Sequence, residues 1–326
     1  MLNLKVIPKL QEIHKLDFLT NRNYNKKIKK EEKMKELDEC TLCPIKCKVN
    51  RNNNQLGKCR AGKKIKIGLY SLHYDEEPCI SGKKGSGTVF FSNCNLKCKF
   101  CQNYKISCEG KGKEISIQEL AEIFLEQQAN GANNINLVTG TPYVIHIIEA
   151  LKIAKEKGLT IPILYNTSGY ETIETLKKLD GYIDIYLPDF KYFDNDLAYR
   201  LSGIKDYKEI TQKAILEMYK QVGKNIYDKN RMLKKGMIIR HLVLPNNIEN
   251  SKQVLNWIKE NFDNDIPISL MAQYFPTYKA KEMTEINRKL TQEEYNEIEK
   301  FLYELELENG YIQDLEDEEE QYVPKF

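Results

Sequence analysis

The sequence predicts an α/β fold, an open (partial) β/α barrel of six units with a small N-terminal cysteine-rich module. Two observations predict it. From Thr88 onward, short apolar segments alternate with amphipathic segments of helical period. Polar, glycine-containing loops follow the apolar segments, as they do in β/α barrels. Six units are fewer than the eight of a closed barrel, so we expect a side opening; a doubly wound open sheet is the alternative.

The predicted elements alternate along the chain. Strands are expected at residues 88–91, 134–138, 161–165, 183–187, 237–244 and 266–272. Helices are expected at residues 117–128, 144–157, 171–179, 208–222, 251–261 and 291–306. Ser116 and Glu119 form a capping box at the first helix. Gly131 and Gly158 stand where the first two helices should end.

The rest of the chain divides into short parts with different compositions. We expect a lysine-rich helical arm at residues 1–39, the cysteine-rich module at 40–80, the barrel at 81–310 and an acidic tail at 311–326. The formal charge of +3 does not favour nucleic-acid binding. No membrane span or signal peptide is expected, which predicts a cytoplasmic location. In a reducing compartment, nine cysteines indicate metal or catalytic roles over disulfides.

The main cysteine motif is C-x3-C-x2-C, formed by Cys94, Cys98 and Cys101 directly after the first predicted strand. Three thiolates can hold three irons of a [4Fe–4S] cluster and leave the fourth iron for an exchangeable ligand. Two zinc ligands with a bystander, or buried apolar thiols, are the alternatives. Neither alternative explains the position after a strand or the aromatic Phe100 before the last cysteine.

A second cysteine set precedes the barrel and comprises Cys40, Cys43, Cys47 and Cys59. Four thiolates can close a metal site in a segment too short to form its own core. A structural zinc, an auxiliary [4Fe–4S] cluster and unligated thiols all remain open at this stage. Cys79 and Cys108 have no partner in the sequence pattern and are interpreted as buried thiols.

Polar side chains gather at the carboxyl ends of the predicted strands, where β/α barrels carry out their chemistry. They are Thr139, Gly140 and Thr141 after the second strand, Asn166 and Ser168 after the third, Asp189 and Lys191 after the fourth, and Arg240 within the fifth. Each signal is ordinary alone; Asp189 and Lys191 could equally form a surface ion pair. Their shared placement predicts a site. His241 falls on the opposite face from Arg240 and is interpreted as a packing histidine.

Several of these motifs together resemble one known family. They are residues 85–87, 90–94 and 101–103 around the cysteine loop, followed by residues 184–192, 240–245 and 271–274. This set is similar to the pyruvate formate-lyase activating enzyme-related branch of the radical S-adenosylmethionine (SAM) superfamily. The N-terminal cysteines are similar to those of its PflX-like group. The resemblance covers residues from about Cys40 to Tyr274.

The resemblance implies roles for the residues identified above. It places the [4Fe–4S] cluster on Cys94, Cys98 and Cys101, with SAM on the open iron. The remaining roles are Phe100 beside the adenine, Thr139, Gly140 and Thr141 at the SAM amino group, Asn166 and Ser168 at the ribose, Lys191 at the SAM carboxylate, Arg240 near the methionine, and Asp189 as the catalytic residue near the substrate backbone. Relatives carry an acidic residue where Thr141 stands.

The activity implied by the resemblance is reductive cleavage of SAM to a deoxyadenosyl radical that abstracts hydrogen. Its most concrete form is activation of a glycyl-radical enzyme, with a low-potential electron donor such as flavodoxin or ferredoxin. Radical modification of another peptide or of a small metabolite is the alternative within the enzyme class. An iron–sulfur electron-transfer protein without SAM chemistry is the alternative from a different class.

Overall fold

The computed structural model describes residues 34–262 and 264–315, and the described residues from Glu36 onward form one compact unit. Most of the expected N-terminal arm and of the acidic tail lies outside these residues. The parallel strands are β2 (Ser86–Phe91), β4 (Ile135–Val138), β5 (Ile163–Thr167), β6 (Ile185–Pro188), β8 (Leu233–Met237), β9 (Ile239–Leu242), β10 (Ile268–Met271) and β11 (Gly310–Ile312). This order confirms the open β/α barrel.

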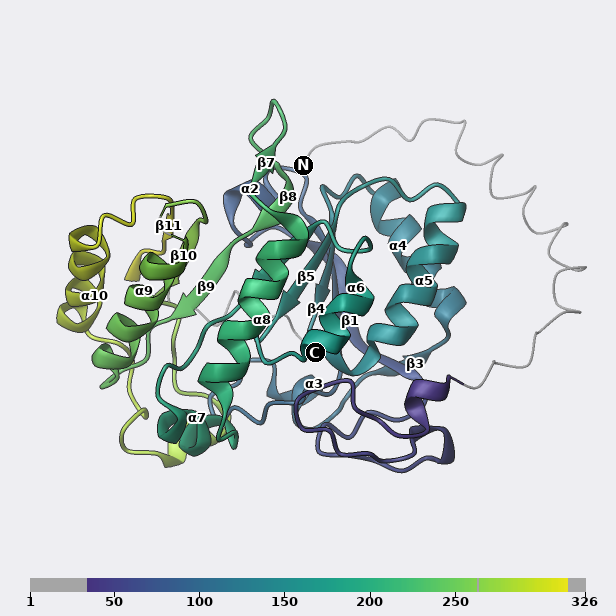
Figure 1. Cartoon of the computed structure of the whole chain (residues 1–326), viewed down its shortest axis with the longest axis horizontal. Helices are drawn as coiled ribbons and strands as arrows, with labels where there is room; N and C mark the ends of the chain where they lie inside the picture. Colours follow the sequence, from purple (N-terminus) through teal and green to yellow (C-terminus); the bar gives the residue numbers. More distant parts are fainter. Residues whose placement is uncertain (1–33, 263, 316–326) are drawn as a thin grey trace, which may run out of the picture. The chain divides into compact units, whose positions relative to one another are not determined.

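Amphipathic helices follow the strands and cover their outer side (Figure 1). They are α4 (Ile117–Ala129), α5 (Val144–Glu156), α6 (Ile173–Leu179), α8 (Tyr207–Val222), α9 (Ile248–Phe262) and α10 (Gln292–Glu304). Each overlaps a predicted helix, and the capping box of Ser116 and Glu119 is present at the start of α4. The helices bury one apolar face against the strands, which is where most of the core lies.

The barrel strands divide into two sheets that meet between β6 and β9. One sheet has the order β3-β1-β2-β4-β5-β6-β8-β7 and the other β11-β10-β9. The prediction of one continuous strand at residues 237–244 was wrong, because pairing changes at Ile238. There the Asn225 side chain accepts the N–H of Met237 at 2.8 Å, while Ile238 donates to Tyr186. A single parallel bridge, Asp189 to Arg240, continues the barrel across this break.

Three antiparallel strands extend the first sheet and were not predicted. β1 (Ile65–His73) pairs with β2, β3 (Lys113–Ile115) pairs with β1, and β7 (Ile226–Tyr227) pairs with β8. The segment that forms β1 alternates apolar and polar residues, but it lies outside the repeating units. It belongs to the same sheet as the first barrel strand, so residues of the expected 40–80 module take part in that sheet.

Three short helices also escaped prediction: α2 (Pro78–Ser81), α3 (Tyr104–Ser107) and α7 (Asn195–Ser202). α2 and α3 are single turns, too short to show a helical period. Asp194 caps the start of α7, because its side chain accepts the N–H of Asp196. Gly203, in the left-handed region, caps the end of the helix. In the described part of the chain, no helix is long and apolar enough to cross a membrane.

The cysteine-rich segment (Figure 1, purple) packs against the turn after β4 and against α6. It contains two 3-10 turns, Lys35–Leu37 and Arg51–Asn53. The guanidinium of Arg51 donates to the carbonyl of Pro142 at 2.6 Å, and the hydroxyl of Thr175 donates to the carbonyl of Leu42 at 2.8 Å. These contacts hold the segment at the carboxyl end of the barrel.

His241 is a packing residue, as its position opposite Arg240 predicted. It is fully buried in β9, with Nδ1 2.7 Å from the carbonyl oxygen of Phe190 and Nε2 2.9 Å from the hydroxyl of Ser251. A carbonyl only accepts, so Nδ1 carries the proton and Nε2 accepts from the serine. Burial lowers the pKa of His241 to about 4, which keeps the ring neutral.

Candidate functional site

The loop that carries Cys94, Cys98 and Cys101 leaves the carboxyl end of β2 and is held by backbone hydrogen bonds. Lys97 and Lys99 donate to the carbonyls of Ser202 and Leu201 at the end of α7, at 3.3 and 2.8 Å. The segment Tyr278–Glu282, a 3-10 helix, holds the other side, where Ala280 donates to Lys99 at 2.8 Å. The loop conformation therefore depends on two elements that are distant in sequence.

Hydroxyl groups lie against two of the three thiols. Ser202 donates to the sulfur of Cys98 at 3.0 Å, and the same hydroxyl lies 2.7 Å from the hydroxyl of Tyr192. The hydroxyl of Ser107 lies 3.1 Å from the sulfur of Cys101. Hydrogen bonds to sulfur stabilise metal-bound thiolates and tune their clusters. The environment of these sulfurs therefore suits thiolate ligands.

Burial and mutual repulsion keep the three thiols protonated unless a cation joins them. Desolvation, followed by repulsion from the neighbouring sulfurs, raises the pKa of Cys94 well above its usual range and that of Cys101 to about 12. Desolvation also raises the pKa of Cys98, although the nearby ammonium of Lys191 opposes this. Binding a metal to the three sulfurs would therefore release protons.

The three thiols are not arranged as ligands of one metal ion in the described part of the chain. Ligands of one zinc must all lie about 2.3 Å from the same point. Across residues 34–262 and 264–315, no group of three His, Cys, Asp or Glu side chains is arranged to hold one metal ion. A [4Fe–4S] cube instead binds each thiolate at a different iron, so its ligands stand further apart. The three sulfurs remain close enough to interact electrostatically.

Phe100 belongs to this loop, and Cys108 lies close to it. Phe100 is buried and packs edge-on against Tyr274, with ring centroids 5.9 Å apart. Cys108, interpreted above as a buried thiol, lies near the motif: its charge raises the pKa of both Cys98 and Cys101. The hydroxyl of Ser107 donates to the sulfur of Cys108 at 3.6 Å. Sequence spacing gave no signal for this proximity.

The turn after β4 carries Thr139, Gly140 and Thr141. Thr139 has a positive φ of 63° and donates its N–H to the carbonyl of Asn166 at 2.9 Å. A side chain at Gly140 would approach Ile147 and Tyr165 closely, so glycine is needed at this position. The missing side chain therefore lets this turn pack directly against the core residues Ile147 and Tyr165.

Thr141 is paired with a buried acid that the sequence analysis did not identify. Its hydroxyl donates to Oε1 of Glu171 at 2.6 Å, and the hydroxyls of Thr167 and Tyr165 donate to the same oxygen. Oε2 is buried without a hydrogen-bond partner among the described residues. Burial raises the pKa of Glu171 to about 7. An acidic group thus lies beside Thr141, the position where the family resemblance implies an acid.

Asn166 and Ser168 lie at the carboxyl end of β5, next to this turn. The main-chain carbonyl of Asn166 accepts the Thr139 N–H, and that of Ser168 accepts the Tyr207 hydroxyl at 2.7 Å. The Tyr207 hydroxyl also donates to the carbonyl of Asp189 at 3.0 Å. Neighbouring strand ends are therefore tied together by main-chain groups, and no described hydrogen bond uses the Asn166 or Ser168 side chain.

Asp189 and Lys191 form a partly buried ion pair beside the thiols, so the prediction of a shared site is favoured over a surface pair. Lys191 Nζ lies 2.5 Å from Asp189 Oδ2, and both side chains are less than one-fifth exposed. Burial alone would lower the pKa of Lys191, but Asp189 and the sulfurs of Cys98 and Cys101 give a net rise. The ammonium therefore stays charged next to the cysteine loop.

Arg240 is held by acidic residues in the barrel interior. Its guanidinium lies 3.1 Å from Glu76, 3.5 Å from Glu77 and 3.9 Å from Asp189. Burial raises the pKa of Glu76, and Arg240 opposes this. Glu76 and Glu77 precede α2 in an unremarkable stretch of sequence, so nothing in the pattern indicated their role. The guanidinium of Arg240 is therefore paired mainly with the carboxylates of Glu76 and Glu77.

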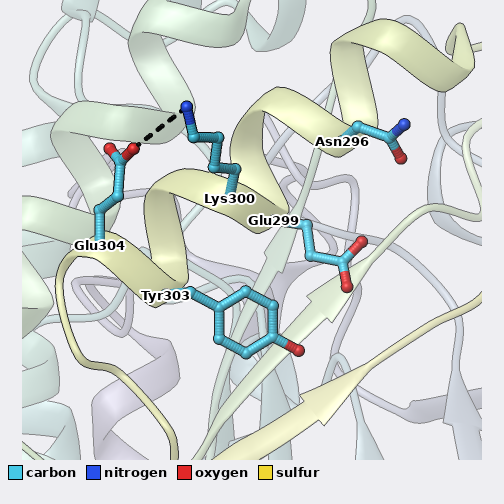
Figure 2. Close-up of a pocket in the computed structure, with 5 residues that line it drawn as sticks. All are labelled: Asn296, Glu299, Lys300, Tyr303 and Glu304. Atoms are coloured by element: carbon cyan, nitrogen blue, oxygen red, sulfur yellow. Dashed lines mark ion pairs between the residues drawn. The ribbon is translucent and has the colours of Figure 1, made fainter.

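Two further features are a small cavity in the cysteine-rich segment and a shallow hollow on the surface. Cys40, Cys43, Cys47 and Cys59 all line one small cavity in the cysteine-rich segment. A shallow hollow on α10 is lined by Asn296, Glu299, Lys300, Tyr303 and Glu304 (Figure 2). These five come from one exposed helix face, and the ion pair of Lys300 with Glu304 at 3.5 Å is a surface pair. The hollow therefore presents no buried polar group for a ligand.

Comparisons with known proteins identify the family and several similar proteins. Residues 88–258 match the family model described as the radical SAM superfamily. An uncharacterised protein of Methanocaldococcus jannaschii is 36% identical over 289 residues, 85% of this chain and 76% of that protein. The pyruvate formate-lyase-activating enzyme of Clostridium pasteurianum is 26% identical over 237 residues, 67% of this chain and 90% of that enzyme. The solved structure of the FeFe-hydrogenase maturase HydG from Carboxydothermus hydrogenoformans aligns with a TM-score of 0.49 at 14% identity, covering 71% of this chain and 54% of HydG.

Gly169 makes a testable contribution to the geometry of the strand ends. Its φ is +77°, and an added Cβ would collide with the main-chain oxygen of Asp189 and approach the methyl of Thr211 at 2.7 Å. We expect Gly169→Ala to lower the free energy of unfolding by about 3 kcal/mol, from left-handed strain plus overpacking. Gly158→Ala is the matched control, because Gly158 also has a positive φ but has no atom within 4 Å of the new Cβ. It should cost about 1 kcal/mol in urea unfolding. Equal losses in the two variants would contradict the close approach.

Proposed function

Because the chain belongs to the radical SAM superfamily, we propose that Cys94, Cys98 and Cys101 hold a [4Fe–4S] cluster at which SAM is reductively cleaved. Family membership implies both cofactors; when bound, they supply a deoxyadenosyl radical that abstracts hydrogen from the substrate. The observation that carries the residue assignment is the group of three neighbouring thiols at the end of β2, with hydroxyl donors and the Lys191 ammonium beside them.

Lys191 is the proposed partner of the SAM carboxylate. It is a buried cation next to the cluster thiols, and its present partner is Asp189. A carboxylate placed beside the cluster would compete with Asp189 for this ammonium. Asp189 would then be free to face the substrate, which is the catalytic position proposed for it. Arg240 is proposed to lie near the methionine part of SAM, although Glu76 and Glu77 already neutralise much of its charge.

The other proposed contacts surround the same strand ends. Thr139, Gly140 and Thr141 are proposed to lie at the SAM amino group, where Thr141 brings the Glu171 carboxylate to the end of β4. Asn166 and Ser168 follow on β5, where the ribose contact is proposed. Phe100 is proposed to lie beside the adenine, and its packing on Tyr274 would fix the ring in place.

The substrate is proposed to be a backbone glycine of a glycyl-radical enzyme. The similarity to a pyruvate formate-lyase-activating enzyme over two-thirds of this chain supports this choice. A low-potential donor such as flavodoxin or ferredoxin would supply the electron. The four N-terminal cysteines are proposed to hold a second metal. Radical modification of another peptide or of a small metabolite would use the same machinery with a different acceptor of the radical.

A direct test of the substrate combines the reduced enzyme, SAM and a glycyl-radical enzyme from the same genome. We expect a glycyl radical detectable by electron paramagnetic resonance (EPR), together with deoxyadenosine in equal amount. Replacing the target glycine by alanine is the control and should remove the signal. SAM cleavage without a protein radical would reject glycyl-radical activation and leave SAM chemistry in place.

Removal of any cluster thiol should abolish SAM cleavage. Cys94→Ala, Cys98→Ala and Cys101→Ala each leave fewer than three ligands, while the chain should stay folded because the loop lies at the end of the barrel. The measurement is deoxyadenosine formed with dithionite after anaerobic reconstitution with iron and sulfide. Cys79→Ala, in a separate part of the core, is the matched control and should retain cleavage. Normal turnover by any of the three loop variants would overturn the cluster assignment.

Removal of either cation should weaken SAM binding without loss of the cluster. Lys191→Ala and Arg240→Ala are each expected to cost about 1.5–3 kcal/mol if the lost contact is a charge-assisted hydrogen bond. Calorimetry on the reconstituted protein measures the affinity, and iron analysis checks the cluster. Lys224→Ala, a surface lysine paired with Asp265, is the control. If both variants bind SAM as the wild type does, neither residue contacts its carboxylate.

A further inference from the structure

We propose that Cys40, Cys43, Cys47 and Cys59 hold a second [4Fe–4S] cluster whose negative charge is balanced by Arg51. This inference deepens the second metal of the proposed function and rests on it. It names iron and sulfide as the occupant in place of zinc. It also assigns a role to a buried arginine that the sequence analysis did not identify.

All four sulfurs belong to one enclosed environment although Cys59 is distant in sequence from the other three. The four cysteines line the same cavity. Cys40 and Cys59 interact electrostatically with each other, and so do Cys59 and Cys43. Gly57 makes this possible, because a side chain there would collide with the sulfur of Cys47. The fold of the segment therefore brings the four thiols together around a small space.

Arg51 supplies a buried positive charge beside these thiols. It is 1% exposed, and its Nη1 donates to the sulfur of Cys40 at 3.9 Å. Its other hydrogen bonds go to the carbonyls of Gly62, at 2.6 and 2.9 Å, and Pro142, at 2.6 Å. These acceptors are neutral, and no ion pair to a carboxylate is found for Arg51 within residues 34–262 and 264–315.

A buried guanidinium without a counter-ion is costly, so this charge requires an anion nearby. Four thiolates around a metal centre provide one, because their negative charge exceeds the positive charge of the metal core. The N–H of Ala61 also donates to the sulfur of Cys59 at 3.4 Å, a contact that stabilises bound thiolates. The donors that face the sulfurs therefore favour an anionic metal site.

The spacing of the thiols favours a cluster over zinc. A tetrathiolate zinc site requires four sulfurs around one point at about 2.3 Å. In the part of the chain that the structure describes, no three of these side chains meet that requirement, although all four line the cavity. The same holds for Cys94, Cys98 and Cys101. A cube with an iron at each corner accommodates sulfurs that surround a space without converging on one ion.

The second site lies against the first. Asn95, which follows Cys94, lines the same cavity as the four cysteines, and so does Pro142 from the turn after β4. The Asn95 side chain donates to the carbonyl of Tyr170 at 2.9 Å, which fixes this wall. The cavity of the four cysteines therefore adjoins the loop that carries Cys94, Cys98 and Cys101.

Metal analysis of full-length protein with Cys94, Cys98 and Cys101 all replaced by Ala tests the proposal. This host lacks the first site, so its metal content does not depend on SAM cleavage. A negative result for the second cluster can therefore be distinguished from failure of the proposed SAM chemistry. After anaerobic purification and reconstitution, we expect about four irons and matching sulfide per chain, with an EPR signal on reduction. Adding Cys43→Ala and Cys59→Ala should remove both. One zinc per chain, or neither metal in a folded protein, would overturn the proposal.

The role of Arg51 is tested in the same host through the reduction potential of its cluster. A nearby positive charge stabilises the more negative reduced state, so Arg51→Met should lower the midpoint potential. Arg51→Lys retains the charge and is the matched control, with a smaller shift expected. Equal potentials in the host, Arg51→Met and Arg51→Lys proteins would overturn the role of Arg51. If Arg51→Met does not fold, the iron content of the reconstituted Arg51→Lys host replaces the potential as the measurement. Iron content equal to that of the parent host supports the charge requirement. An Arg51→Lys host that binds no iron overturns it.

Discussion

The contact between Asp189 and Arg240 is the constraint on which the site depends. It is the bridge by which β6 meets β9 where the two sheets are otherwise unpaired. Its main-chain geometry places Arg240 toward Glu76 and Glu77, and Asp189 toward Lys191. The barrel can be open and still have a defined interior because buried, opposite charges hold its two parts in register. The same charges lie at the strand ends where the SAM site is proposed.

Buried cations recur wherever thiols gather in this protein. Lys191 lies beside the Cys98 sulfur, and Arg51 beside the Cys40 sulfur. In both places burial disfavours charged thiolates, while the cation and local N–H or O–H donors favour them. A metal centre bound at either set would resolve this opposition by adding positive charge. The two cysteine sets therefore follow one electrostatic arrangement despite their different spacings.

Acidic groups reach the site from positions that family motifs do not predict. Relatives carry an acid in the turn where this chain has Thr141, and here Glu171 from the following unit hydrogen-bonds to that threonine. Its raised pKa, near 7, and its unpartnered oxygen arise from burial. Glu76 reaches the interior from before α2 in the same way.

The sequence by itself determined the repeating units, the two cysteine sets and the polar strand ends, because these depend on local periodicity and short spacing. The family followed from the C-x3-C-x2-C loop. Tertiary structure decided the features that depend on long-range pairing. These are the break in the strand at Ile238, the pairing of β1 with β2, and the hydrogen bonds between the end of α7 and the cysteine loop. It also decided that Glu171 and Arg51 are buried beside the site. No local sequence pattern reveals these residues, because their burial and their contacts with distant side chains depend on the tertiary fold.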